Sequence, residues 1–177
     1  MKYYEFLILQ SMATNAEEVI SAANALSCPE TLAGVAIPTD LNKCEIWQIL
    51  ALKSMQPESA YVKAAEILLG LEQWQVENEE VEKVLGFGNW LAEQMKQAAD
   101  LFKKCHVPPT PEEKAAGVEQ LNFGDFGLLD WFAQRMHITH DAAEHTNWLI
   151  VWQCMYNDAQ KTLYERRLMK VRSRKKK

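Results

Sequence analysis

The feature that most constrains this fold is a stripe of large apolar residues near the end of the chain, spaced three or four positions apart. The stripe comprises Trp148, Trp152, Met155, Ala159 and Leu163. Residues at this spacing share one face of an α-helix, so the pattern predicts a long helix from about residue 146 to about residue 170. Similar periodicity recurs along most of the chain, and we expect an all-α protein, a bundle of about eight short helices.

The composition supports a folded helical protein. Seven Gly and six Pro among 177 residues are too few for a turn-rich β-sandwich or barrel. Six Trp, six Phe and five Tyr require a buried core. No apolar run approaches the roughly 20 residues that span a bilayer, and Met1 to Phe6 makes a poor signal peptide. We therefore expect a cytoplasmic protein with reduced cysteines and no membrane contact.

Start and stop signals divide the remaining helical segments. A capping box at Thr14 to Glu17 predicts a helix that Cys28 and Pro29 end. Pro57 predicts the first turn of a helix that ends at Gly70. An extended segment is expected at 33–37, and a helix after Asp40 or Asn42 should have Cys44, Trp47, Leu50 and Ala51 inward. A helix at 77–85 is expected to break at Gly86 and Gly88, and another should follow with Leu91, Met95, Ala98 and Phe102 on one face. A helix at 124–136 should bury Leu128, Phe132 and Met136.

Residues 105–120 contain three prolines and the greatest departure from helical periodicity. Pro108, Pro109 and Pro111 favour extended backbone without ladder hydrogen bonds. This segment predicts a Pro-rich joint before a C-terminal helical pair. The domain prediction is an N-terminal helical region at 1–104, a linker at 105–120, a C-terminal helical region at 121–170 and a basic tail at 171–177.

The residues with metal-binding or catalytic chemistry do not form a convincing site. His137, His140, Asp141, Glu144 and His145 would share one face of a single helix, as metal ligands do. Thr139, however, is better placed to end that helix and cap a new one, and the order does not match the H-E-x-x-H pattern. Cys105 and His106 are adjacent and point apart, and no phosphate-binding glycine motif occurs. We expect no catalytic residues, no metal site and no cofactor.

One segment resembles a known family. The residues from Asp130 to Glu144 (DWFAQRMHITHDAAE) and from Thr146 to Leu149 (TNWL) are similar to the C-terminal signature of bacteriophage tail assembly chaperones. That signature combines a small residue, Arg, a hydrophobic residue and Ile-Thr with an acid-rich turn and a Trp-containing helix. The resemblance covers residues 125–155 closely and 40–165 loosely. It implies a non-catalytic helical protein of a phage or prophage, cytoplasmic in the bacterial host, that binds the tape-measure protein during tail assembly and forms homo-oligomers.

Binding a helical client requires apolar side chains at helical spacing. The candidate partner-binding residues are Trp74, Leu128, Trp131, Phe132, Trp148, Trp152 and Met155.

A basic C-terminus suggests an alternative function. Eight of the 19 Lys and Arg lie from Arg166 onward, where there is no acid, so residues 1–165 carry 11 basic against 24 acidic side chains. Candidate phosphate contacts are Arg172, Arg174, Lys175, Lys176 and Lys177. The alternative is a small helical nucleic-acid-associated protein that uses this tail, although the acidic body would repel a duplex.

Overall fold

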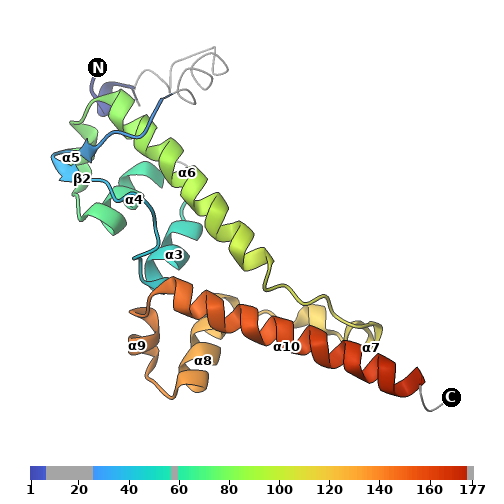
Figure 1. The fold of residues 1–177 in the computed structure, drawn as a ribbon. Coiled ribbons are helices and arrows are strands. Elements are labelled where there is room, and N and C mark those ends of the chain that lie inside the picture. The colour runs from blue at the N-terminus through green and yellow to red at the C-terminus, as the bar shows by residue number, and fades with distance from the viewer. Residues whose placement is uncertain (7–25, 57–59, 175–177) are drawn as a thin grey trace. The chain divides into compact units, whose positions relative to one another are not determined.

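A computed structural model describes residues 1–6, 26–56 and 60–174, and it is mostly helical (Figure 1). The described ranges hold two β-strands of two residues each, and the rest of the regular structure is helix, which confirms the expected fold class. The elements are β1 (Thr31–Leu32), β2 (Val35–Ala36), α3 (Ile46–Lys53), α4 (Ala60–Leu69), α5 (Gln73–Glu77), α6 (Val81–Lys103), α7 (Pro111–Ala115), the 3-10 helix η2 (Val118–Gln120), α8 (Gly124–Met136), α9 (His140–Glu144) and α10 (Trp148–Arg174).

Some predictions concern residues outside these ranges. The capping box at Thr14 to Glu17, the helical start at Pro57 and the basic residues Lys175 to Lys177 lie outside the described residues. Among the helices within the described ranges, none combines the length and apolarity needed to cross a membrane.

The chain divides into two compact units. Unit 1 comprises residues 1–41 and 48–97, and unit 2 comprises residues 42–47 and 98–177. The largest fully buried side chains of unit 1 are Leu32, Val76, Val84 and Phe87, and those of unit 2 are Ile46, Phe132 and Val151. Unit 2 therefore combines a short N-terminal segment with the C-terminal part of the chain.

Unit 1 contains the small antiparallel hairpin, in which Thr31 pairs with Ala36 and Leu32 with Val35. The two-residue turn places Ala33 and Gly34 at φ 46° and 80°. A left-handed conformation costs an alanine about 1–2 kcal/mol. The Ala33 N–H donates to a carboxylate oxygen of Glu79 at 2.7 Å, which helps to hold this turn. The extended segment expected at 33–37 is thus confirmed at Val35 and Ala36, and it is wrong at Ala33 and Gly34, which form the turn.

Helix α4 ends where the sequence predicted. Gly70 has φ 66°, its N–H donates to the Glu66 carbonyl, and the Leu71 N–H donates to the Ala65 carbonyl. This arrangement satisfies the last carbonyls of the helix and favours glycine, which reaches a positive φ without steric cost. Ala64 and Ala65 are buried, as expected.

The predicted break at Gly86 and Gly88 is wrong, because α6 runs without interruption from Val81 to Lys103. A Cβ on Gly86 would lie 2.2 Å from the Ser27 carbonyl oxygen, and one on Gly88 would lie 2.3 Å from the Tyr61 ring. The glycines therefore do not end a helix. They remove side-chain volume where residue 27 and the Tyr61 ring approach α6 closely.

The inward face of α3 also differs from the prediction. Ile46, Ile49 and Leu52 are buried, with exposed fractions of 0%, 2% and 4%. Trp47 and Leu50 are only partly buried. The segment from 46 to 52 is apolar at nearly every position, so its periodicity alone did not determine which residues point inward.

In unit 2, α8 has the predicted bounds of Gly124 and Met136, and Phe132 is buried as expected. Leu128 is only partly buried and Met136 is 45% exposed, so those two inward positions are wrong. Thr139 caps α9 as expected, because its side-chain oxygen accepts the Ala142 N–H at 3.2 Å.

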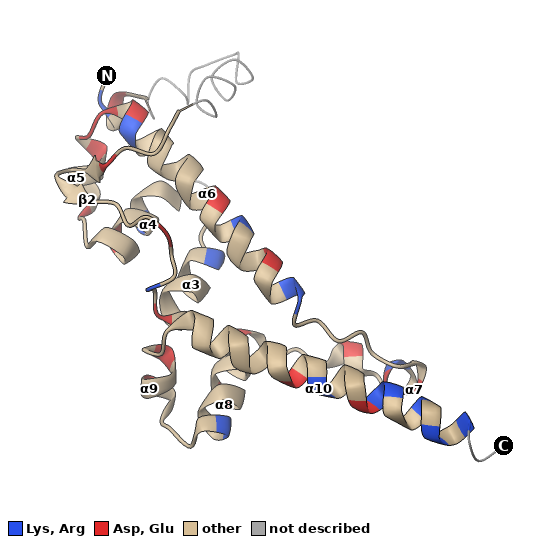
Figure 2. Ribbon diagram, in the orientation of Figure 1, with Lys and Arg blue, Asp and Glu red and all other residues tan. Residues whose placement is uncertain are grey.

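Helix α10 differs slightly from its predicted range of 146–170. It begins at Trp148, where the Asn147 side chain accepts the Leu149 N–H, and it continues to Arg174. The last turns contain no helix breaker, and basic residues there interact favourably with the helix dipole. Lys and Arg positions are concentrated on these turns (Figure 2).

Candidate functional site

The candidate site is an apolar pocket of about 520 Å³ within unit 2. Three elements form its walls: the segment 105–118, helix α8 and helix α10. The lining residues are Cys105, Val107, Pro109, Glu113, Val118, Gly127, Leu128, Trp131, Met155, Asp158, Ala159, Thr162 and Arg166. Its volume is in the range of protein ligand pockets, and its walls are largely apolar with a few charged groups, as such pockets are.

Helices α8 and α10 form two walls and are joined beside the pocket. Leu128 and Trp131 lie three residues apart on α8, so both face the same side of that helix. The Arg135 guanidinium lies 5.7 Å from the centre of the Trp131 ring and forms an ion pair with Asp158 of α10. This ion pair connects the two walls and keeps a cation on the face of the indole.

The third wall is the segment that the sequence suggested was a linker, and it contains α7 and η2. Thr110 begins α7 with a reciprocal capping box, in which its N–H donates to the Glu113 carboxylate and its hydroxyl accepts the Glu113 N–H. The Thr110 N–H lowers the pKa of the Glu113 carboxyl, and the Arg166 charge lowers it further. Glu113 is therefore ionised at neutral pH.

Arg166 attaches this wall to α10. Its guanidinium donates to both carboxylate oxygens of Glu113, at 2.9 and 3.0 Å, and to the Pro108 carbonyl at 2.6 Å. Both hydrogen bonds to the carboxylate come from Nη2 and the one to the Pro108 carbonyl comes from Nη1, so a single guanidinium serves both acceptors. The contact joins residues of the pocket wall that are 53 and 58 positions apart in sequence.

Three of the predicted partner-binding residues line the pocket, namely Leu128, Trp131 and Met155. Phe132 and Trp148 lie in the core of unit 2, with exposed fractions of 1% and 3%. Trp152 is partly buried and donates its indole N–H to the Leu101 carbonyl at 2.9 Å.

Trp74 lies elsewhere, in α5 of unit 1, and is 59% exposed. Its indole N–H donates to the neighbouring Glu72 carboxylate at 2.6 Å. The sequence placed this residue in a loop, whereas it belongs to a short helix. Its exposure is that of a side chain available for contact with another molecule.

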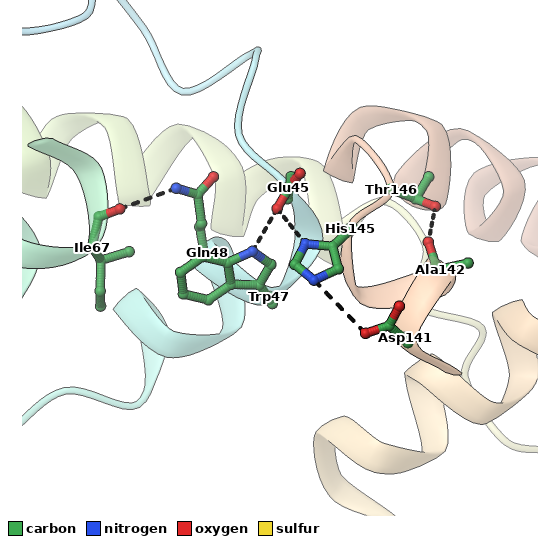
Figure 3. Close-up of polar contacts among 8 residues, drawn as sticks. All are labelled: Glu45, Trp47, Gln48, Ile67, Asp141, Ala142, His145 and Thr146. Carbon is green, nitrogen blue, oxygen red and sulfur yellow. Dashed lines mark hydrogen bonds and ion pairs between the residues drawn. The ribbon is translucent and has the colours of Figure 1, made fainter. Parts of the chain in front are cut away.

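The histidines around residue 140 are dispersed. His137 ends α8 in a left-handed conformation with φ 55°, and His140 lies 3.1 Å from an Asp130 oxygen. His145 contacts the Glu45 carboxylate through Nδ1 at 2.8 Å, and its Nε2 lies 4.0 Å from Asp141 (Figure 3). Within the described ranges, no three His, Cys, Asp or Glu side chains are grouped so as to hold a metal ion.

The contact between His145 and Glu45 also shifts both pKa values. The hydrogen bond that the Glu45 carboxylate accepts from His145 raises the pKa of His145 and lowers the pKa of the Glu45 carboxyl. Glu45 further accepts the Trp47 indole N–H at 2.6 Å. Both partners are substantially exposed, so the pair is a local contact on the surface of unit 2.

Cys105 lines the pocket, and its environment does not activate its sulfur. Its Sγ lies 3.9 Å from the Leu101 and Trp152 carbonyl oxygens, and burial raises the pKa of the thiol. A nucleophilic cysteine requires the opposite shift, because the thiolate is the reactive form. The pocket lining is thus suited to binding an apolar surface, and Glu113, Asp158 and Arg166 are its charged groups.

Sequence reasoning missed two parts of this region. Val107, Pro109 and Val118 were treated as linker residues, although they line the pocket. Phe123 and Phe126 at the start of α8 are 69% and 65% exposed. The alternation of Leu, Phe and Gly at 121–127 was the available signal, since exposed large apolar residues near a pocket are typical of interaction surfaces.

The comparisons with known proteins add no relative, since no protein-family model, curated protein or solved structure matches this chain.

Proposed function

We propose that this protein acts by binding an apolar helical segment of another protein, and that it is a tail assembly chaperone whose client is the tape-measure protein. The observation that carries the proposal is the pocket of unit 2, whose apolar lining includes Leu128, Trp131 and Met155. These residues lie in or beside the segment that resembles the chaperone family.

The dimensions of the pocket favour a helix as its occupant. On α10 the lining extends from Met155 to Arg166, and eleven residues of helix correspond to about 16 Å. A helical ligand that docks through side chains at i, i+3, i+4 and i+7 needs about 10 Å of groove. The lining is therefore long enough for one full set of anchors.

The test is co-expression of the full chain with the tape-measure protein encoded in the same genome. Leu128→Glu and Met155→Glu each place a charge on the pocket wall, and we expect both to abolish co-purification. Ile150→Glu is the matched control, because Ile150 is on α10, is 51% exposed and does not line the pocket. Circular dichroism of each variant verifies that its helical content is retained.

Two results would contradict the proposal. One is that the wild-type chain neither co-purifies with the tape-measure protein nor changes its solubility. The other is that folded Leu128→Glu and Met155→Glu variants bind the client as well as the Ile150→Glu control does.

A further inference from the structure

The chemistry of the client can be inferred from the part of α10 that continues beyond the pocket. Thr162, Arg166, Lys170 and Arg174 follow one another at intervals of four residues, and this spacing forms one row along a helix surface. Thr162 and Arg166 line the pocket, and Lys170 and Arg174 do not. The row therefore begins in the pocket and continues as two basic residues past its end. We call the last two residues of this four-residue row, Lys170 and Arg174, the basic row.

The three basic residues of the four-residue row differ in whether an acidic side chain pairs with them. Arg166 is compensated, because Glu113 accepts two of its hydrogen bonds. Lys170 and Arg174 are exposed, and neither forms an ion pair with any residue in the described ranges. Their charges are consequently available to another molecule, and Figure 2 shows that Lys and Arg positions are concentrated near the end of α10.

An exposed apolar residue lies on the face of α10 that Thr162 and Arg166 share. Met169 is three positions after Arg166, and its exposed fraction of 71% is high for so large an apolar side chain. A flexible thioether adapts to the surface of a binding partner. The surface beyond the pocket thus combines an apolar contact with two uncompensated positive charges.

We propose that the client segment is an amphipathic helix of about 19 residues that lies antiparallel to α10 and carries acidic residues in its N-terminal turns. Its apolar stripe fills the pocket, and its acidic turns meet Lys170 and Arg174. The length is the distance from Met155 to Arg174, about 28 Å at 1.5 Å per residue. This inference rests on the proposed function, since it assumes that a helix occupies the pocket.

The antiparallel direction follows from the helix dipoles. The C-terminal turn of α10 carries partial negative charge, and the N-terminal turn of a helix carries partial positive charge. An antiparallel client places its N-terminus beside the end of α10, where the two dipoles attract. Acidic residues are also most favourable in the first turn of their own helix, so charge pairing and dipole both select this direction.

The experiment uses two labelled synthetic peptides of 19 residues with the same composition. Both carry leucines at helical spacing, and their glutamates are either in the N-terminal third or in the C-terminal third. Fluorescence anisotropy measures the binding of each peptide to the full-length chain. The protein variants are Lys170→Glu with Arg174→Glu, the control Lys161→Glu with Arg172→Glu, and Leu128→Glu. The control makes the same change in net charge at exposed positions of the same helix that face away from the basic row.

We expect the wild-type protein to bind the peptide with N-terminal glutamates about tenfold more tightly than the other peptide, a preference that weakens as salt is added. Reversing the charges at positions 170 and 174 removes or inverts this preference between the two peptides, and the control variant largely keeps it. Equal binding of the two peptides, or equal effects of the two double variants, would overturn the inference.

The outcomes separate this inference from the proposed function. One outcome is that Leu128→Glu abolishes binding of both peptides, while the ratio of the two peptide affinities is the same in the wild-type protein and in the Lys170→Glu, Arg174→Glu variant. The pocket then binds helices, and the inferred preference for N-terminal acidic residues is wrong. If neither peptide binds the wild-type protein at all, both ideas fail. If a single-stranded oligonucleotide displaces the preferred peptide through Lys170 and Arg174, the basic row belongs to a nucleic-acid surface, and the proposed client chemistry is wrong.

Discussion

Replacing Gly86 by alanine provides a sharp test of the fold, because helix propensity and packing predict opposite signs. In the interior of a helix, glycine is about 1 kcal/mol less favourable than alanine, so propensity alone predicts a more stable protein. The added Cβ, however, would lie 2.2 Å from the Ser27 carbonyl oxygen and 3.1 Å from its carbon. Both are backbone atoms, which cannot rotate away as a side chain does.

The magnitude follows from these two contributions. Overpacking costs typically 1–3 kcal/mol, and a contact this short with backbone belongs at the upper end. After the gain of about 1 kcal/mol in propensity, we expect Gly86→Ala to lower the free energy of unfolding by about 2 kcal/mol. For a chain of this size, that corresponds to a decrease of about 4–8 °C in the thermal midpoint.

Thermal and urea unfolding followed by circular dichroism measure the effect. Ala92→Gly is the matched control, because Ala92 is exposed on the same helix and reports propensity alone. We expect that control to lose about 1 kcal/mol. A Gly86→Ala protein that is more stable than wild type by a similar amount would refute the close approach of residue 27 and would restore the interpretation of Gly86 as a local helix breaker.

Three further predictions concern two tryptophans, the C-terminal residues and the contact between His145 and Glu45. Trp148→Ala removes a side chain that is 3% exposed and should cost about 3–5 kcal/mol of stability, whereas Trp74→Ala, at 59% exposed, should leave the urea midpoint nearly unchanged. Truncation after Lys170 should not shift the thermal midpoint, because the described residues beyond it are exposed. The contact raises the pKa of His145 from 6.5 and lowers the pKa of Glu45 from 4.5, so it stabilises the fold fully between about pH 4.5 and pH 6.5. Its contribution is lost as pH rises through the raised pKa of His145 or falls through the lowered pKa of Glu45, and Glu45→Gln should return the pKa of His145 toward 6.5 in an NMR titration.

Local chemistry explains which elements could be predicted from the sequence. The ends of α4 and α8 depend on nearby signals, namely Gly70 after one helix and the Thr139 cap beyond the other. The continuity of α6 depends on contacts with residue 27 and Tyr61, which are far away in sequence. Propensity describes Gly86 and Gly88 as breakers, because it contains no information about a distant backbone that needs their missing side chains.

The candidate site was also predictable only where it depends on local sequence patterns. Leu128, Trp131 and Met155 follow helical periodicity, which marks them as apolar residues on a helix face. The wall that contains α7 was not predicted, because it depends on Arg166 pairing with Glu113 across 53 residues. Three prolines suggest a linker when considered alone, whereas the long-range ion pair attaches this segment to α10.

The short segment 42–47 has a consequence for how this protein can be divided. It belongs to unit 2, although the chain on both sides of it belongs to unit 1. Its backbone pairs with the start of α10: the Ile46 N–H donates to the Thr146 carbonyl, and the Trp148 N–H donates to the Cys44 carbonyl. A fragment that begins at residue 98 therefore lacks a piece of its own fold. A protease cut near residue 97 would leave two polypeptides still joined by these hydrogen bonds, and a synthetic peptide of residues 42–47 would be the missing complement of the C-terminal fragment.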